Sequence, residues 1–145
     1  MPRYINDIIV HCTATKSGRE VSRAEVDSWH RARGFRSIGY HYLVHLDGAV
    51  ERGRPISQAG AHCLGHNAHS VGICYVGGLD ADGQPCDTRT KEQKSALLKL
   101  VCKLVKMYRC DVHGHRDYAA KACPCFDAHA EYSGIYKRMI EDVQK

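Results

Sequence analysis

The chain has 145 residues, of which 43% are hydrophobic and 26% are charged, and its formal net charge is +5. These values are typical of one globular domain with its own core, and they exclude a disordered chain. No apolar run approaches the roughly 18 residues of a membrane helix, and the first residues lack the apolar segment of a signal peptide. We therefore expect a single domain over residues 1–145, made in the cytoplasm without a signal peptide.

The basic residues are scattered along the chain and form no long block of like charge. A mildly basic surface favours an anionic partner such as nucleic acid, anionic lipid or bacterial cell wall. Nucleic-acid binding usually needs a concentrated basic patch, which this sequence does not have. We expect a monomer with no nucleic-acid partner and no membrane partner.

The first part of the chain predicts a strand followed by a helix. Residues 8–13 are apolar and β-branched, which is typical of a buried strand. Ser22 and Glu25 have the spacing of a capping box. They predict a helix over about residues 23–33 that ends near Gly34.

The middle of the chain predicts a hairpin and a further buried strand. Residues 40–46 predict a strand, and Asp47-Gly48 predicts a two-residue turn into a partner strand over 49–52. Residues 71–76 are mostly apolar and predict a central strand. A polar loop is expected to follow it.

The last part of the chain predicts two helices around a short strand. Thr90 starts a second capping box, which predicts a helix over about residues 91–109. A strand over 111–113, an irregular segment over 114–126 and a last helix over about 128–143 are expected to follow. Strands interleaved with helices predict an α/β domain whose central mixed β-sheet is flanked by about three α-helices.

Histidines and cysteines are the most informative residues, with 10 of the former and 8 of the latter. Nothing in the sequence points to an oxidising compartment, so we expect reduced thiols, most of them in the core. His11 lies inside the first predicted strand. A histidine in a buried strand is either satisfied by a hydrogen bond or bound to a metal.

A second group of polar residues follows the predicted strand near residue 113. His113 and His115 stand at its end, and Cys123 lies farther along the same irregular segment. Strand ends are where α/β folds place sites, and two His with one Cys suit a catalytic zinc that keeps one position open. Lys121 is either a solvated loop residue or a cation beside this metal, and Tyr40 is either a packing residue or a proton donor.

Four strings occur in family-like order and spacing: IVHCTAT (9–15), WHRARGFRSIGYHYLVHLDGAVERGR (29–54), GAHCLGHNAHSVGICYVGG (60–78) and KACPCFD (121–127). Together they resemble the zinc-dependent N-acetylmuramoyl-L-alanine amidases, a family that includes the short lysozyme-type amidases of T-odd phages and the peptidoglycan recognition proteins of animals. The resemblance covers about residues 5 to 135. It implies an amidase-like α/β fold and hydrolysis of the amide bond between N-acetylmuramic acid and L-alanine in bacterial peptidoglycan.

The resemblance also implies roles for single residues. His11, His115 and Cys123 match the ligands of one Zn²⁺ per chain. Tyr40 and Lys121 match the two other residues that lysozyme-type members need for cleavage. We therefore expect a zinc amidase of the Tyr/Lys type.

Other residues of the matched strings have weaker or alternative roles. His62 and Asn67 match positions that line the substrate groove. Cys125 could act as a second thiolate ligand, although we favour Cys123 alone, and His113 is expected beside the ligands or at the surface. A fourth ligand from Cys125 or His113 would instead make a structural zinc site.

The resemblance also implies where such an enzyme acts and which functions other than catalysis are open to it. A wall-degrading enzyme without a signal peptide reaches the cell wall or periplasm after lysis, through a holin pore or by dedicated export, as a phage or prophage endolysin does. The alternatives to catalysis are a peptidoglycan-binding module that does not cut the wall and a phage-type regulator that binds RNA polymerase.

Overall fold

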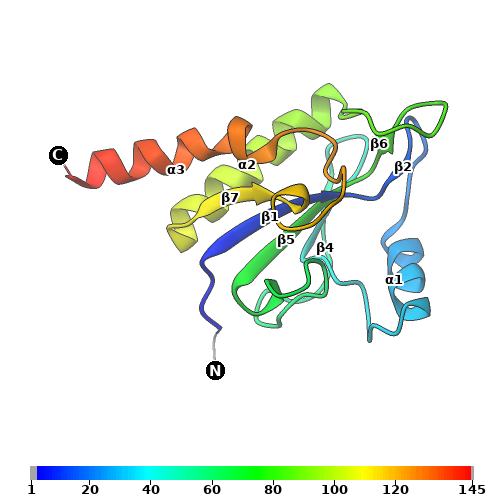
Figure 1. Cartoon of the computed structure of the whole chain (residues 1–145), viewed down its shortest axis with the longest axis horizontal. Helices are drawn as coiled ribbons and strands as arrows, with labels where there is room; N and C mark the ends of the chain where they lie inside the picture. Colours follow the sequence, from blue (N-terminus) through cyan, green and yellow to red (C-terminus); the bar gives the residue numbers. More distant parts are fainter. Residues whose placement is uncertain (1–2, 145) are drawn as a thin grey trace.

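The computed structural model describes residues 3–144, with side chains as far as residue 142. A mixed five-stranded sheet with the order β4-β3-β5-β1-β7 forms its centre (Figure 1). The strands are β1 (Asp7–Cys12), β3 (Tyr42–Val44), β4 (Val50–Arg52), β5 (Ser70–Tyr75) and β7 (Asp111–Gly114). β1 is parallel to β5 and β7, β3 is parallel to β5, and only the β3–β4 pair is antiparallel.

Three α-helices and a small second sheet complete the fold. The helices are α1 (Arg23–Ala32), α2 (Lys91–Tyr108) and α3 (Ala128–Gln144). β2 (Thr15–Lys16) pairs with β6 (Gly78–Leu79), and η1 (Asn67–His69) and η2 (His115–Asp117) are short 3₁₀ turns. The expected α/β architecture is confirmed. Within residues 3–144 no helix is both long enough and apolar enough to span a membrane.

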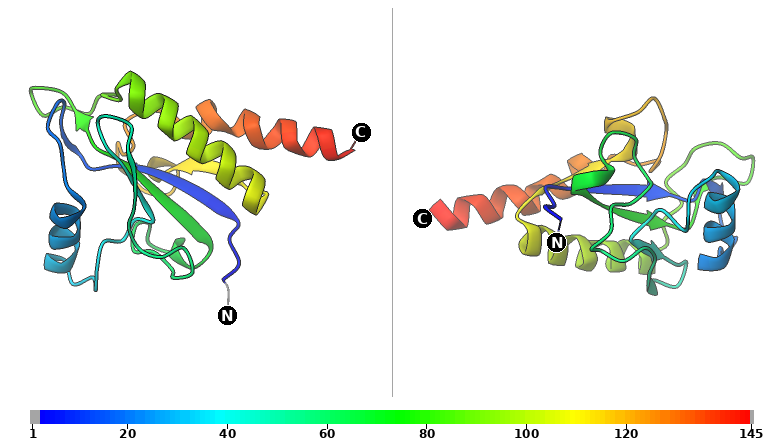
Figure 2. Two further views of the ribbon diagram at one scale, coloured as in Figure 1. Left: turned by 180° about the vertical axis from the view of Figure 1, so that it is seen from behind. Right: turned by 90° about the horizontal axis from the view of Figure 1, so that it is seen from below.

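The two faces of the sheet have separate cores. Ile8 and Val10 of β1 pack with the apolar faces of α2 and α3. The other face has a smaller core that includes Val26 of α1 and Cys74 of β5. Figure 2 shows α2 lying across the sheet, α3 extending beyond it and α1 at the other end of the molecule. Because side chains alternate along a strand, His11 points away from the α2–α3 core.

Local signals explain where the helices begin. The side chain of Ser22 accepts a hydrogen bond from the Glu25 backbone, and Glu25 accepts one from the Ser22 backbone. Thr90 and Gln93 form the same reciprocal pair at the start of α2. Both predicted capping boxes are therefore confirmed.

The predicted hairpin is present, but the prediction that a two-residue turn connects its strands is wrong. The connection runs over residues 45–49, where the Gly48 N–H donates to His45 O and the His45 N–H donates to Ala49 O. The Asp47 carboxylate accepts a hydrogen bond from the Ala49 N–H at 2.9 Å. This side-chain bond stabilises a wider loop than the primed turn that an Asp-Gly pair usually indicates.

Arg89 ties the loop before α2 to the start of α3 and to Phe126 just before that helix. Its side chain is only 2% exposed. The guanidinium donates hydrogen bonds to Asp87 at 2.9 Å and to Glu131 at 2.8 Å. It also lies 3.4 Å from the centroid of the Phe126 ring and donates to the Tyr132 hydroxyl at 3.1 Å. One buried cation therefore joins two chain segments, the loop before α2 and the start of α3.

Arg89→Met is expected to lower the free energy of unfolding by about 2–3 kcal/mol. Loss of a buried cation from an ion pair usually costs about 3–5 kcal/mol, and the figure is reduced here because both carboxylates are partly exposed. Urea unfolding at neutral pH measures the change. Arg31→Met is the matched control, because it breaks a surface ion pair with Asp27 and should cost much less than Arg89→Met. Equal losses in the two variants would contradict a special role for Arg89.

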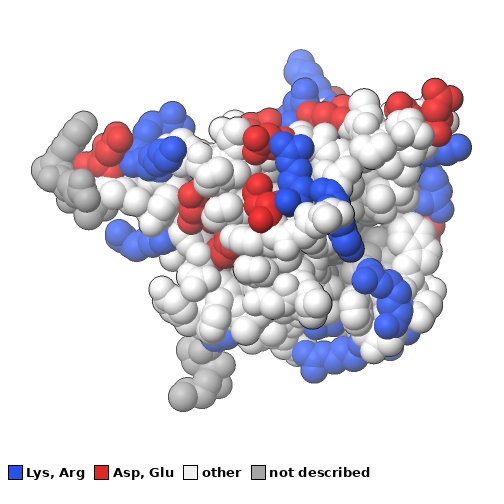
Figure 3. Space-filling model, in the orientation of Figure 1, with Lys and Arg blue, Asp and Glu red and all other residues white. Residues whose placement is uncertain are grey.

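The charged side chains do not gather into one block on the face drawn in Figure 3. Lys and Arg side chains are spread among uncharged surface, and several have Asp or Glu side chains beside them. This distribution agrees with the scattered basic residues of the sequence.

Candidate active site

His11, His115 and Cys123 come together at one end of the central strands. One ligand atom from each lies within 4.8 Å of the other two. His11 is buried near the end of β1, His115 opens η2 directly after β7, and Cys123 lies in the loop before α3. Parallel neighbours such as β1 and β7 end at the same edge of a sheet, which is where α/β folds place their sites. The expected cluster is present, and its donor atoms could hold a metal ion.

Backbone contacts fix the loop that carries Cys123. The Arg116 N–H donates to Cys123 O at 2.8 Å, and the Cys12 N–H donates to Cys123 Sγ at 3.3 Å. Gly114 lets this loop approach β7, because a Cβ at that position would lie 2.8 Å from Cδ of Pro124. The thiol of Cys123 is therefore held toward β1.

Cys125 has different surroundings from Cys123. Its backbone has a positive φ of 67°, and its Sγ lies 3.9 Å from Sγ of Cys12. Burial, with Cys12 as its neighbour, raises the pKa of Cys125 to about 12. It does not belong to the group of three ligand atoms.

The His11 ring has a different partner at each nitrogen. Its Nδ1 lies 3.9 Å from Cys123 Sγ, and its Nε2 lies 2.8 Å from Nδ1 of His62. Burial lowers the pKa of His11 well below its usual value, and the neighbouring His62 and His115 lower it further. His11 is therefore neutral near pH 7, which is the form that binds a metal.

The contact between His62 and His11 is one that sequence reasoning missed. His62 was expected along the substrate groove, and the structure places its side chain in the interior, 9% exposed, under β1 and β5. Its Nε2 lies 3.2 Å from the Ser70 hydroxyl. A Cβ at Gly72 would lie 2.6 Å from the His62 ring, so this glycine makes room for it. A glycine inside a strand indicates a close approach of this kind, and it was the signal available in the sequence.

Asn67 supports the loop in which His62 lies. Its Oδ1 accepts hydrogen bonds from the backbone N–H groups of His62 at 2.9 Å and Cys63 at 3.0 Å. Asn67 thereby fixes the backbone at His62. This structural contact is enough to explain why an asparagine stands at position 67, with no contact to a substrate needed.

Tyr40 and Lys121 lie beside the cluster in different environments. The ring centroids of Tyr40 and His11 are 5.1 Å apart. Burial raises the pKa of Tyr40 well above its usual value, so its hydroxyl keeps its proton near neutral pH. Lys121 is exposed, and its charge adds to the effect of burial in lowering the pKa of His115. The site therefore has a protonated hydroxyl and a cation near the three candidate metal ligands.

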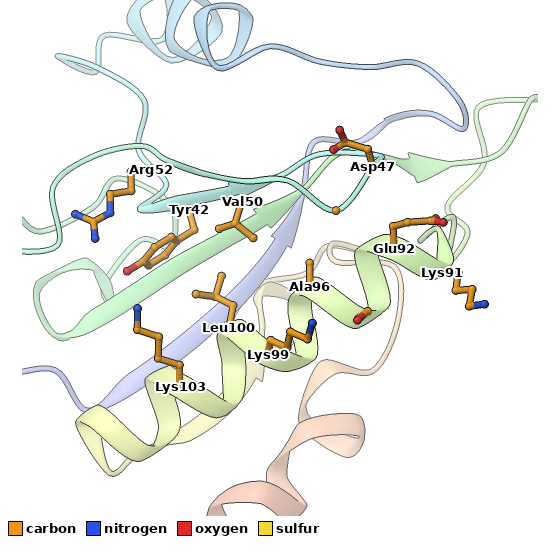
Figure 4. A pocket seen from close by; sticks show the side chains of 12 residues that line it. Tyr42, Asp47, Val50, Arg52, Lys91, Glu92, Ala96, Lys99, Leu100 and Lys103 are labelled. Carbon is orange, nitrogen blue, oxygen red and sulfur yellow. The ribbon is translucent and has the colours of Figure 1, made fainter.

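A groove of about 750 Å³ lies elsewhere, between α2 and the β3–β4 hairpin. Figure 4 shows Tyr42 and Val50 of the hairpin facing Leu100 of α2, with Lys99 and Lys103 beside them. None of the candidate catalytic or metal-binding residues lines this groove. It is separate from the site around His11.

Comparison with known proteins identifies relatives over most of the chain. The sequence profile of a family described as N-acetylmuramoyl-L-alanine amidase matches residues 1–126. The endolysin of Klebsiella phage KP32 is 43% identical over 123 residues, which are 84% of this chain and 82% of the phage protein.

Solved structures of similar fold agree with this result. The N-acetylmuramoyl-L-alanine amidase LysC from Clostridium intestinale URNW superposes with a TM-score of 0.77 at 28% identity, covering 94% of this chain and 86% of LysC. A structure of tracheal cytotoxin bound to the ectodomain complex of the peptidoglycan recognition proteins LCa and LCx has a TM-score of 0.71 at 29% identity, covering 88% and 80%.

Proposed function

Because the chain belongs to the N-acetylmuramoyl-L-alanine amidase family, we propose that His11, His115 and Cys123 bind one Zn²⁺. With it, the chain hydrolyses the bond between N-acetylmuramic acid and L-alanine in bacterial peptidoglycan, as an endolysin. The main support for the proposal is that these three side chains lie together in a chain that belongs to this family. Their pattern of two imidazoles and one thiol is a ligand set of catalytic zinc sites.

The residues present fit zinc in number and in chemistry. Three protein ligands leave the fourth position of a tetrahedral ion open for water or substrate. When bound, zinc supplies a Lewis acid, which polarises the amide carbonyl and lowers the pKa of a water molecule to about 7. The depressed pKa of His11 and His115 keeps both imidazoles neutral and ready to bind.

Tyr40 and Lys121 act on the substrate in this proposal. The Tyr40 hydroxyl keeps its proton near pH 7 and can donate a hydrogen bond to the oxygen on which negative charge develops. Lys121 places a positive charge near the same atoms, as its effect on His115 indicates. One of the two stabilises the oxyanion, and the other can protonate the leaving amine.

His62 positions a ligand in this proposal. If the metal takes Nδ1 of His11, the Nε2–H of His11 donates to Nδ1 of His62, and Nε2–H of His62 then donates to Ser70. This chain fixes the tautomer and the ring plane of His11, which is what a hydrogen bond to the second nitrogen of a metal ligand does.

The physiological setting is also part of the proposal. Phage endolysins act on the cell wall, and we propose that this chain reaches it after lysis or through a holin-type pore, and that peptidoglycan is its partner. We further propose that residues 1–145 act as one catalytic domain and as a monomer.

The test combines metal analysis with an assay of the bond that is cut. Purified full-length protein is analysed for zinc and incubated with purified peptidoglycan while new amino groups of L-alanine are measured. We expect amine release that a chelator abolishes and added zinc restores. Zinc at the cluster without amine release, on walls of several chemotypes, would favour a non-catalytic binding module or a regulator and would overturn the enzymatic proposal.

His62→Phe is expected to weaken zinc binding by about 10–100-fold, because it keeps a buried ring but removes the acceptor for His11. A competition titration with a zinc chelator measures the dissociation constant, and the activity at saturating zinc should change much less. His62→Gln offers an amide oxygen and should recover part of the affinity. Unchanged zinc affinity in the Phe variant would show that His62 only fills space.

A further inference from the structure

We propose a second metal site, formed by Asp111, His113 and His129, which binds a divalent transition-metal ion such as Zn²⁺ or Ni²⁺. One ligand atom from each of these residues lies within 4.8 Å of the other two. Two of the residues belong to β7 and one to the first turn of α3. The site shares no ligand with the His11 cluster, so it stands or fails independently of the proposed amidase mechanism.

The two imidazoles are arranged as a pair that solvent can reach. The rings of His113 and His129 are parallel within 4°, and their centroids lie 4.6 Å apart. The side chains are 27% and 40% exposed, so an ion can enter from solution. The Asp111 carboxylate lies beside the pair, with Oδ2 3.8 Å from Nδ1 of His129, the same nitrogen that bonds to the Val112 backbone. It brings a negative charge that favours a cation at this place.

Each imidazole already has the hydrogen bond that metal-binding histidines usually have. The Nδ1–H of His113 donates to Oδ1 of Asp7 at 2.8 Å, and the other oxygen of Asp7 accepts from the Tyr118 hydroxyl. The Nδ1–H of His129 donates to the backbone oxygen of Val112 at 2.8 Å. In both rings the proton is then on Nδ1, and Nε2 keeps a lone pair for a metal.

The side chains must rotate to close around an ion, because a metal lies in the plane of each imidazole that binds it and these two rings are parallel and stacked. Zinc–nitrogen and zinc–oxygen bonds of about 2.0–2.2 Å place tetrahedral ligand atoms about 3.4 Å apart. The three ligand atoms lie within 4.8 Å of one another, so they must approach by at most about 1.4 Å. Partly exposed side chains can rotate by this amount. Imidazole nitrogens favour zinc, nickel or copper over magnesium or calcium, which prefer oxygen ligands.

A bound ion would join the edge strand β7 to α3. β7 has a single neighbour, β1, in the sheet, so its other edge depends on contacts with α3. Because only the folded chain brings β7 and α3 together, metal binding there stabilises the fold by mass action. The expected sign is a rise in melting temperature beyond that given by the first metal ion.

The test counts metal ions per chain. Full-length protein is dialysed to equilibrium against buffered Zn²⁺, and bound zinc is measured for wild type, His113→Asn/His129→Asn and Cys123→Ser. We expect two zinc ions in the wild type and one in each variant, with the double variant keeping its amidase activity. The combination of all three substitutions should bind none.

The control removes two histidines that belong to neither cluster, His45 and His69, and His45→Asn/His69→Asn should still bind two zinc ions. A wild type that binds only the ion lost in Cys123→Ser overturns the proposal, as does a second ion that survives in His113→Asn/His129→Asn. A third outcome is a wild type that binds one ion, which Cys123→Ser keeps and the double histidine variant loses. That outcome supports the second site and contradicts the zinc of the proposed function. Asp111→Asn alone serves if the double variant fails to fold, and it should weaken the second ion about tenfold.

Discussion

Cys123→Ser is expected to abolish zinc binding at the His11 cluster and to lower amidase activity by about a thousandfold or more. The thiolate is the anionic ligand among the three, and a serine hydroxyl is a much poorer one at neutral pH. The fold should be largely kept, because Cys123 is partly exposed and its loop is held by a backbone hydrogen bond to Arg116. Zinc content and release of L-alanine amines measure the two effects.

Cys125→Ser is the matched control, since it makes the same change two residues along the loop. Its thiol contacts Cys12 and is absent from the group of three ligand atoms. We expect zinc binding and activity close to those of the wild type. Full activity in Cys123→Ser, or an equal loss in both variants, would refute the assignment of Cys123 as the thiolate ligand.

Tyr40→Phe is expected to lower kcat by about 10²–10³-fold while zinc binding is unchanged. Removal of one donor from an oxyanion site costs about this much in other enzymes. The ring next to His11 is kept, so the change isolates the hydroxyl. Steady-state kinetics on soluble peptidoglycan fragments, with zinc content measured in parallel, separates a lost proton donor from a lost metal.

Tyr42→Phe is the control for Tyr40→Phe, because Tyr42 faces the separate groove between α2 and the hairpin (Figure 4). It should keep kcat within about twofold. If Tyr40→Phe also stays within that range, the hydroxyl has no part in the chemistry and Lys121 alone must supply the stabilising charge.

The sequence predicted best the features that local residues determine. Both capping boxes depend on side chains three residues apart, so Ser22 and Thr90 identify the starts of α1 and α2 without knowledge of the rest of the fold. The convergence of His11, His115 and Cys123 was expected from strand ends and from family resemblance. The turn after β3 was mispredicted, because the Asp47 side chain bonds to Ala49 and widens the loop.

The features that sequence reasoning missed depend on contacts between distant segments. His62 reaches His11 across 51 residues, because the loop before β5 carries it against β1. Arg89 belongs to no sequence motif, yet its side chain bonds to Glu131, which lies 42 positions farther along the chain. The stacked pair of His113 and His129 requires the first turn of α3 to lie against β7, which no periodicity in the sequence reports.

The Arg89 contacts also bear on where this catalytic unit can be cut or fused. The family profile ends at residue 126, whereas Tyr132 is 1% exposed and Glu131 pairs with Arg89. Trimming the gene at the end of the profile would remove both partners and uncover Phe126, the ring on which Arg89 rests. Helix α3 therefore belongs to the folding unit, and a fusion partner is better joined beyond it.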